Sequence, residues 1–191
     1  MLAISVLFLV GCSGSDGDVK KPKETAVTVT TGDCFEINKL KGEDGNEKFS
    51  YAVKTHDGTV IESAVCANEP KVKPLNDDLL GVRFYTATDS FVRYYDIKGG
   101  RVSASYFGAF WDNGELLAYN DFEKSGKLIV RDIFDDSGYR YEKEITSDAM
   151  ELIVTSAEPT DDGETLVVKF KLGDHGAEKN VRLPLIEKSS D

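Results

Sequence analysis

The sequence has little of what most enzymes use for catalysis. It contains only two histidines and one tryptophan among 191 residues. It has no Gly-x-Ser-x-Gly elbow, no His-Glu-x-x-His pair and no glycine-rich phosphate loop. Its most extended apolar block, Leu2–Val10, is about half of the roughly 20 residues that a membrane-spanning helix needs. These absences argue against the common hydrolases, zinc proteases and nucleotide-binding enzymes, and against a transmembrane helix.

Basic residues are outnumbered by acidic ones. The chain has 23 Lys and Arg against 34 Asp and Glu, which gives a net charge of −11. Such a surface repels nucleic acids and anionic lipid headgroups, and it favours cationic partners or simple solubility. We therefore expect no nucleic-acid partner.

The N-terminus carries the most specific motif. The apolar block Leu2–Val10 continues into Leu9-Val10-Gly11-Cys12 and then into polar residues. A short apolar core with a small residue before a cysteine is typical of a secretory signal. Leu9-Val10-Gly11-Cys12 resembles the lipobox of bacterial lipoproteins, whereas a buried apolar strand with a chance cysteine is the alternative. The resemblance implies that residues 1–11 are a signal peptide and that Cys12 carries the lipid, which includes acyl chains of the palmitate type.

The same resemblance implies a location in the cell. Two or three acyl chains give stable membrane attachment, so the chain would be held on a membrane of the cell envelope. Ser13 after the cysteine resembles the signal for the outer membrane facing the periplasm in Gram-negative bacteria. Residues 12–25 then form a lipidated cysteine with a flexible polar tether. Residues 26–191 form a single domain.

Two further cysteines, Cys34 and Cys66, lie in the exported part. An even pair of cysteines in an exported protein favours a disulfide. Closing the loop between them would stabilise the folded state by about 3–4 kcal/mol. A zinc site is the alternative, but His56 and His175 are the only histidines and neither has ligand spacing with a cysteine. Two free buried thiols are the third alternative. We expect no metal and no cofactor.

The pattern of turns and apolar residues predicts an all-β fold. Asp-Gly and Asn-Gly pairs such as Asp57-Gly58 and Asn113-Gly114 recur along the chain and favour tight hairpins. Between them, apolar residues alternate with period two, as at Leu166, Val168 and Phe170. The pattern predicts an antiparallel meander of about 11–12 short strands, arranged as a sandwich or barrel, or as a small propeller-like array.

Aromatic residues are concentrated in the middle of the chain. Fourteen of the 19 lie between Phe84 and Tyr141. Most can be core, but exposed rings on a sheet are stacking platforms for sugars or peptides. Trp111, next to a turn, is the ring most expected to be exposed. The candidate binding residues are Tyr106, Phe110, Trp111, Ser137, Tyr139 and Tyr141.

One loop motif gives a more specific hypothesis. Ser137-Gly138-Tyr139-Arg140-Tyr141 resembles the Ser-Gly-x-x-Tyr loop of bacterial lysozyme inhibitors, which are small exported β proteins. That resemblance implies an inhibitory loop at Ser137 and Tyr141, and the net charge of −11 would suit a basic lysozyme. An ordinary hairpin turn is the alternative.

The sequence thus predicts a membrane-anchored lipoprotein of the cell envelope that binds an envelope protein or glycan, or serves as a structural spacer. No residue is singled out as catalytic. An envelope hydrolase with a carboxylate pair is the alternative from another class, because the many carboxylates of the chain leave such a pair open.

Overall fold

The computed structural model describes residues 25–41, 45–121, 126–145 and 151–186, and most of them belong to short antiparallel strands joined by turns. The described residues form sixteen strands and contain no helix, so the all-β prediction is confirmed. The signal segment, Cys12 and the tether up to residue 24 lie outside the described residues. No helix among the described residues is long and apolar enough to cross a membrane.

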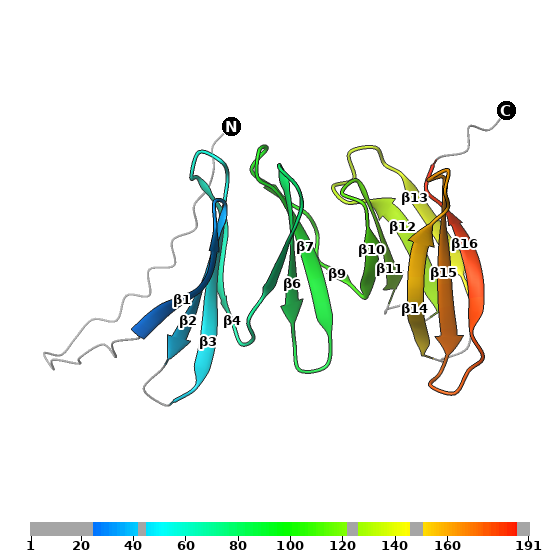
Figure 1. Ribbon diagram of the computed structural model, residues 1–191, viewed down its shortest axis with the longest axis horizontal. Helices are drawn as coiled ribbons and strands as arrows, with labels where there is room; N and C mark the ends of the chain where they lie inside the picture. Colours follow the sequence, from blue (N-terminus) through cyan, green and yellow to red (C-terminus); the bar gives the residue numbers. More distant parts are fainter. Residues whose placement is uncertain (1–24, 42–44, 122–125, 146–150, 187–191) are drawn as a thin grey trace, which may run out of the picture.

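The strands form four antiparallel sheets, each of them made from consecutive strands (Figure 1). Sheet A contains β1 (Thr25–Gly32), β2 (Phe35–Lys41), β3 (Glu47–Lys54) and β4 (Val60–Cys66). Sheet B contains β5 (Lys71–Asn76), β6 (Leu79–Tyr85), β7 (Ser90–Asp96), β8 (Arg101–Val102) and β9 (Tyr106–Phe107), the last paired with β7.

The second half of the chain repeats this arrangement. Sheet C contains β10 (Ala109–Asp112), β11 (Leu116–Asp121), β12 (Lys127–Asp132) and β13 (Arg140–Glu144). Sheet D contains β14 (Leu152–Pro159), β15 (Thr165–Leu172) and β16 (Lys179–Pro184). The strand count exceeds the predicted 11–12 partly because β8, β9 and β10 are only two to four residues long.

The four sheets stack face to face in a row, with sheet A at one end and sheet D at the other (Figure 1). Three separate apolar clusters hold the row together. Tyr51 and Val82 belong to the A/B cluster, Tyr94 and Leu117 to the B/C cluster, and Val130 and Leu166 to the C/D cluster. Sheets B and C are therefore covered on both faces, and the row is a repeated sandwich that does not close into a barrel or a ring.

The outer sheets show the alternation expected from the sequence. On β15, Leu166, Val168 and Phe170 are buried against sheet C, whereas Lys169 is exposed. On the outer face of sheet A, Thr28 donates a hydrogen bond to Asn38, and Val65 is 58% exposed. This face is therefore a mixture of polar and apolar side chains.

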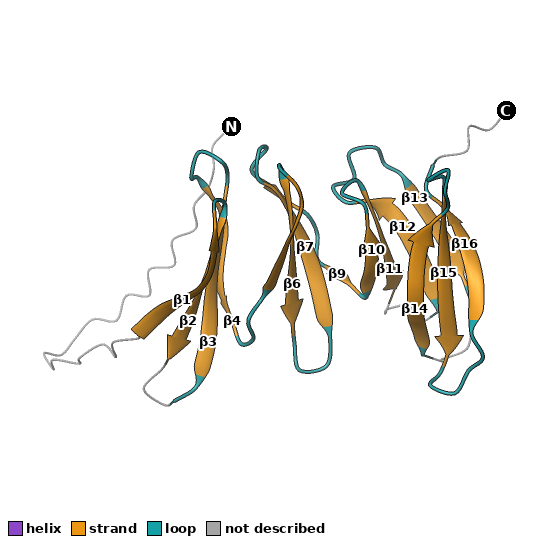
Figure 2. Cartoon of the chain, viewed as in Figure 1, coloured by secondary structure: helices purple, strands orange, loops and turns teal. Residues whose placement is uncertain are grey.

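The turns also follow the sequence. Gly58 has a φ of 87° and Gly114 a φ of 94°. These left-handed values suit the Asp-Gly and Asn-Gly hairpins that the sequence predicts, because glycine adopts them without steric cost. Figure 2 shows the connecting loops of sheets A and B together at the same upper end of the row.

The expected disulfide between Cys34 and Cys66 is not formed, and both cysteines are free. The register explains why. The Lys54 amide at one end of β3 donates to the Cys34 carbonyl, whereas Cys66 pairs with Phe49. Five residues of a strand span about 17 Å, and bridged cysteines need Cα atoms within about 7 Å. Of the three alternatives, the structure favours free thiols.

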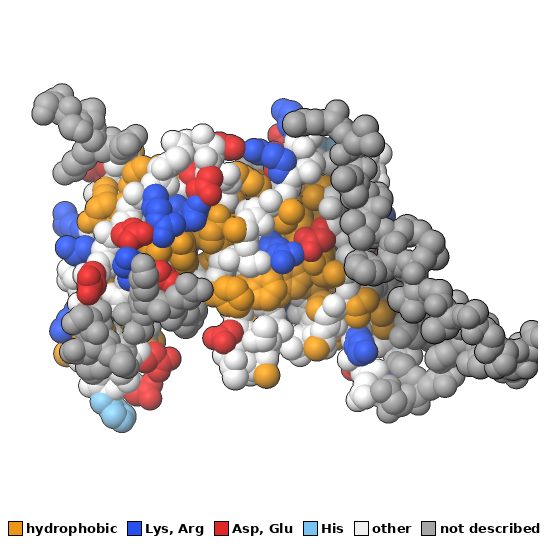
Figure 3. Space-filling model, turned by 180° about the vertical axis from the view of Figure 1, so that it is seen from behind, with side chains coloured by type: hydrophobic (Ala, Val, Ile, Leu, Met, Phe, Trp, Pro, Cys, Tyr) orange, Lys and Arg blue, Asp and Glu red, His pale blue; other side chains and the backbone are white. Residues whose placement is uncertain are grey.

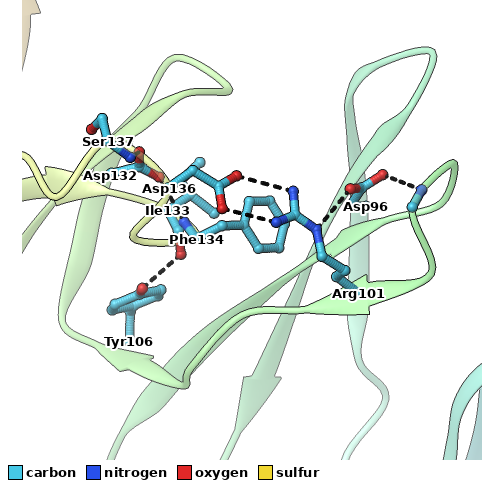
Figure 4. A network of polar contacts seen from close by, with 9 residues as sticks. Asp96, Arg101, Tyr106, Asp132, Ile133, Phe134, Asp136 and Ser137 are labelled. Atoms are coloured by element: carbon cyan, nitrogen blue, oxygen red, sulfur yellow. Dashed lines mark hydrogen bonds and ion pairs between the residues drawn. The ribbon is translucent and has the colours of Figure 1, made fainter. Parts of the chain in front are cut away.

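Polar contacts tie neighbouring sheets together at their edges. Figure 4 shows Arg101 of β8 reaching between Asp96 of its own sheet and Asp136 in the loop after β12. The Arg101 guanidinium also lies 4.8 Å from the centre of the Phe134 ring. These hydrogen bonds raise the pKa of Arg101, and they join sheets B and C on the solvent side.

Candidate functional site

A hollow with aromatic walls lies between sheets B and C, and we call it the B/C groove. Its volume is about 310 Å³. The floor is formed by Lys71 and Lys73 of β5, Gly81, Arg83 and Tyr85 of β6, and Val92 and Tyr94 of β7; the wall is formed by Phe110, Trp111 and Asp112 of β10.

The strand register explains how the floor residues come together. Lys71 pairs with Arg83, and Lys73 pairs with Gly81. Because directly paired residues point to the same face of an antiparallel sheet, these four residues share the face that looks toward sheet C. The period-two pattern Lys71-Val72-Lys73 and Gly81-Val82-Arg83 was a signal that could have located this face from the sequence.

The groove is cationic in a chain that is otherwise acidic. It is lined by three basic residues, and Asp112 is the single acidic residue among those that line it. The ammonium groups of Lys71 and Lys73 are at the mouth, with side chains 62% and 67% exposed. The excess of basic side chains in the groove is opposite in sign to the net charge of the whole chain, which is −11.

The remaining polar groups are fixed by hydrogen bonds. Arg83 Nη2 donates to the Ala109 carbonyl at 3.0 Å, which holds the guanidinium against β10. Asp112 accepts from Lys73 Nζ and from the Tyr94 hydroxyl, each at 3.2 Å. Burial and the adjacent Asp112 charge raise the pKa of Tyr94. At the rim, Lys71 Nζ lies 3.4 Å from Glu69 Oε1. The polar groups of the groove are therefore held by contacts on the floor and at the rim.

Gly81 leaves the middle of the floor open. It is buried in the interior of β6, where glycine weakens a strand and often marks the close approach of a ligand. A Cβ atom at this position would meet Tyr94 Cε1 at 3.5 Å, an ordinary contact. A side chain would thus fit there, and it would fill the groove.

The aromatic residues singled out in the sequence have separate places. Phe110 and Trp111 line the groove, but both also pack against the C/D cluster and are only partly exposed. Trp111 is therefore not the exposed ring that its turn position suggested. Tyr106 is a core residue, 4% exposed, whose hydroxyl donates to the Ile133 carbonyl at 2.7 Å.

The Ser137–Tyr141 loop lies elsewhere. Ser137 is exposed in the loop between β12 and β13. Tyr139 and Tyr141 pack against the C/D cluster, and the Tyr139 hydroxyl donates to the Pro184 carbonyl at 2.6 Å. Both rings thus pack between sheets C and D. The inhibitor loop stays a prediction that the structure does not test.

Large apolar side chains are exposed both at the groove and elsewhere on the surface. Figure 3 shows, on one face of the molecule, a band of hydrophobic side chains across the middle with charged residues on its sides. The exposed aromatic side chains include Tyr85, at the groove, and Phe107, on β9. Tyr85 is therefore the ring of the groove that is most open to a ligand, and sequence reasoning did not identify it.

No metal centre accompanies these features. Within the described ranges, no group of three or more His, Cys, Asp and Glu side chains is arranged to hold a metal ion. Comparison of the chain with protein-family models, with curated proteins and with solved structures finds no match.

Proposed function

We propose that this chain is a membrane-tethered binding module of the cell envelope, and that its B/C groove binds a carboxylate-bearing glycan. One observation supports the choice of ligand: three cations surround an open glycine floor beside Tyr85 and Trp111, in a chain of net charge −11. Lysine and arginine pair with carboxylates, and aromatic rings offer an apolar platform to a sugar ring. The tether follows from the lipobox-like motif ending at Cys12.

The groove does not favour the hydrolase alternative. A glycosidase needs two carboxyl groups on either side of the bond that it cleaves. Asp112 is the single carboxylate among the lining residues, and it is held by Lys73 and Tyr94. The groove is thus equipped to hold an acidic sugar, whereas it lacks the second carboxylate for hydrolysis.

The test is calorimetric titration of the full chain carrying Cys12→Ser with galacturonic acid oligosaccharides, and with uncharged galactose oligosaccharides of the same length. We expect a Kd below about 1 mM for the acidic glycan and no measurable heat for the neutral one. Filling the floor with Gly81→Leu is expected to weaken binding at least about tenfold, a loss of about 1.4 kcal/mol. Lys169→Ala, on the outer face of sheet D, is the matched control and should leave binding unchanged.

Two results would contradict the proposal. One is equal binding by the chain and by its Gly81→Leu variant, because the groove would then not be the site. The other is tighter binding of a short acidic peptide than of the acidic glycan, because lysines on an edge strand would then be recognising a polypeptide.

A further inference from the structure

The turns at the upper end of sheets A and B bring together three side chains that are distant in sequence. Cys34 follows the turn between β1 and β2, His56 lies in the turn between β3 and β4, and Asp78 lies in the turn between β5 and β6. Cys34 Sγ is 3.6 Å from His56 Nδ1, and His56 Nε2 is 3.0 Å from Asp78 Oδ1. One imidazole therefore connects a thiol to a carboxylate.

The carboxylate determines which ring nitrogen can take a proton from the thiol. Asp78 can only accept in its ionised form, so Nε2 carries the hydrogen. Nδ1 then presents its lone pair to Cys34 Sγ. A thiol next to such a base can exist as a thiolate beside an imidazolium ion, which is the reactive form of cysteine.

Several contacts hold the histidine in this position. The His56 amide donates to the Ile97 carbonyl at 3.3 Å. In the same turn, the Asp57 carboxylate accepts from the Thr59 amide at 3.0 Å, which shapes the loop. The charged groups around the ring are Asp57, Asp78 and Lys98, whose ammonium lies 3.8 Å from Asp78. The ring is thus positioned by three separate turns.

Access to the sulfur is narrow. Cys34 is 5% exposed, whereas the His56 side chain is 51% exposed. His56 also lines a hollow of about 340 Å³ at the surface. Cys34 is not among the residues that line this hollow, and its low exposure excludes bulky reagents from the sulfur. A small oxidant suits this geometry better than a protein disulfide.

Cys66 provides the contrast within the same chain. Its thiol lies 3.1 Å from the Asn68 carbonyl oxygen and 3.5 Å from the Phe49 carbonyl oxygen. Burial raises the pKa of the Cys66 thiol. The two free cysteines therefore have opposite surroundings, one with a base and one without.

We propose that Cys34 is a peroxide-oxidised thiol, with His56 and Asp78 as its positioning residues. The thiol proton moves to His56 Nδ1, and the sulfur attacks one oxygen of hydrogen peroxide. The O–O bond breaks as the S–O bond forms, and the leaving hydroxide takes the proton from Nδ1 to become water. Sulfur loses two electrons to the peroxide, and the product is a sulfenic acid at Cys34.

The product is expected to persist. Cys66 lies about 17 Å away along the sheet, too far to form a disulfide with it. The low exposure of Cys34 also excludes larger thiols from its sulfur. Cys34 would thus record exposure to peroxide as a single-site modification, independently of the ligand in the B/C groove.

The test uses the full chain carrying Cys12→Ser, treated with hydrogen peroxide at neutral pH and sampled by peptide mass spectrometry. We expect Cys34 to gain one oxygen about tenfold faster than Cys66, since a free thiol has only a few per cent thiolate at this pH. Asp78→Asn should slow the oxidation of Cys34 several-fold, and His56→Gln should lower the oxidation rate of Cys34 to that of Cys66. Asp161→Asn, in an exposed turn of sheet D, is the control and should change neither rate.

Cys66 serves as the internal standard in every variant. General unfolding would increase the oxidation rate of both thiols, whereas loss of the base would lower the oxidation rate of Cys34 alone. Equal oxidation of the two cysteines in the parent chain would overturn the proposal. An unchanged Cys34 rate in both Asp78→Asn and His56→Gln would overturn it as well.

Discussion

Raising the pH from about 10 to about 12 is expected to lower the free energy of unfolding of this chain by at least about 5 kcal/mol. Most of the loss comes from two tyrosines at neighbouring positions of β7 that point to opposite sheets. Tyr94 is 1% exposed and Tyr95 is 0% exposed. Burial raises the pKa of both phenols far above 10, and their hydrogen bonds to Asp112 and Glu62 raise it further.

The direction follows from proton binding in the two states. An unfolded tyrosine releases its proton near pH 10, whereas the folded ones keep theirs. Above pH 10 the unfolded state therefore binds fewer protons, and stability falls by about 1.4 kcal/mol per pH unit for each tyrosine. Two tyrosines over two pH units give the stated loss. Below pH 10 their contribution is constant.

Urea unfolding followed by circular dichroism at several pH values measures the effect. Tyr51, whose pKa burial and the Glu62 charge raise to about 12, adds a third contribution to the slope in both proteins. Tyr95→Phe removes one of the three contributions, so its stability should fall with about two-thirds of the slope. A free energy of unfolding that stays constant between pH 10 and pH 12 would show that these phenols ionise equally in the folded and unfolded states, contrary to this account.

The sequence was sufficient for the fold class but not for the number of layers. Alternation along Leu166–Leu172 is visible because one face of sheet D meets solvent. In sheet C, β11 and β12 are buried on both faces, and Leu117 and Ala118 are both 0% exposed. A strand that is buried on both faces shows no alternation of apolar and polar residues. The stacking of four sheets could therefore not be predicted from the spacing of the apolar residues alone.

The candidate sites show the same limit. His56 is a half-exposed turn residue, as its sequence context suggests, but its neighbours Cys34 and Asp78 come from two other turns. The disulfide prediction failed because the cysteine count carries no information about register. The cationic face of the B/C groove, by contrast, was readable from the period-two spacing of Lys71 and Lys73.

Replacing Glu62 by alanine is expected to lower the free energy of unfolding by about 3 kcal/mol. Glu62 Oε1 accepts from Arg93 Nη1 at 2.6 Å and from the Tyr51 hydroxyl at 3.1 Å. Its other oxygen accepts from the Tyr95 hydroxyl at 2.6 Å. One carboxylate thus satisfies three donors between sheets A and B.

The loss is large because two of the three donors, the hydroxyls of Tyr51 and Tyr95, belong to buried side chains. The Glu62 side chain is 22% exposed and that of Arg93 is 33% exposed. Without the carboxylate, a guanidinium stays between the sheets with no opposite charge, and two buried phenols lose their acceptor. An unpaired buried donor costs the full desolvation penalty of the group. Glu62→Gln keeps an acceptor oxygen and should cost about half as much.

Arg101→Ala is the matched comparison, because Arg101 also joins two sheets through carboxylates. Its side chain is 48% exposed and that of Asp136 is 60% exposed. Exposed ion pairs contribute about 0–1 kcal/mol, so this variant should lose at most about a third of what Glu62→Ala loses. Urea midpoints at neutral pH decide the comparison. Equal losses in the two variants would mean that the A/B network is as solvated as the edge contact, and that the apolar cluster alone holds sheet A to the row.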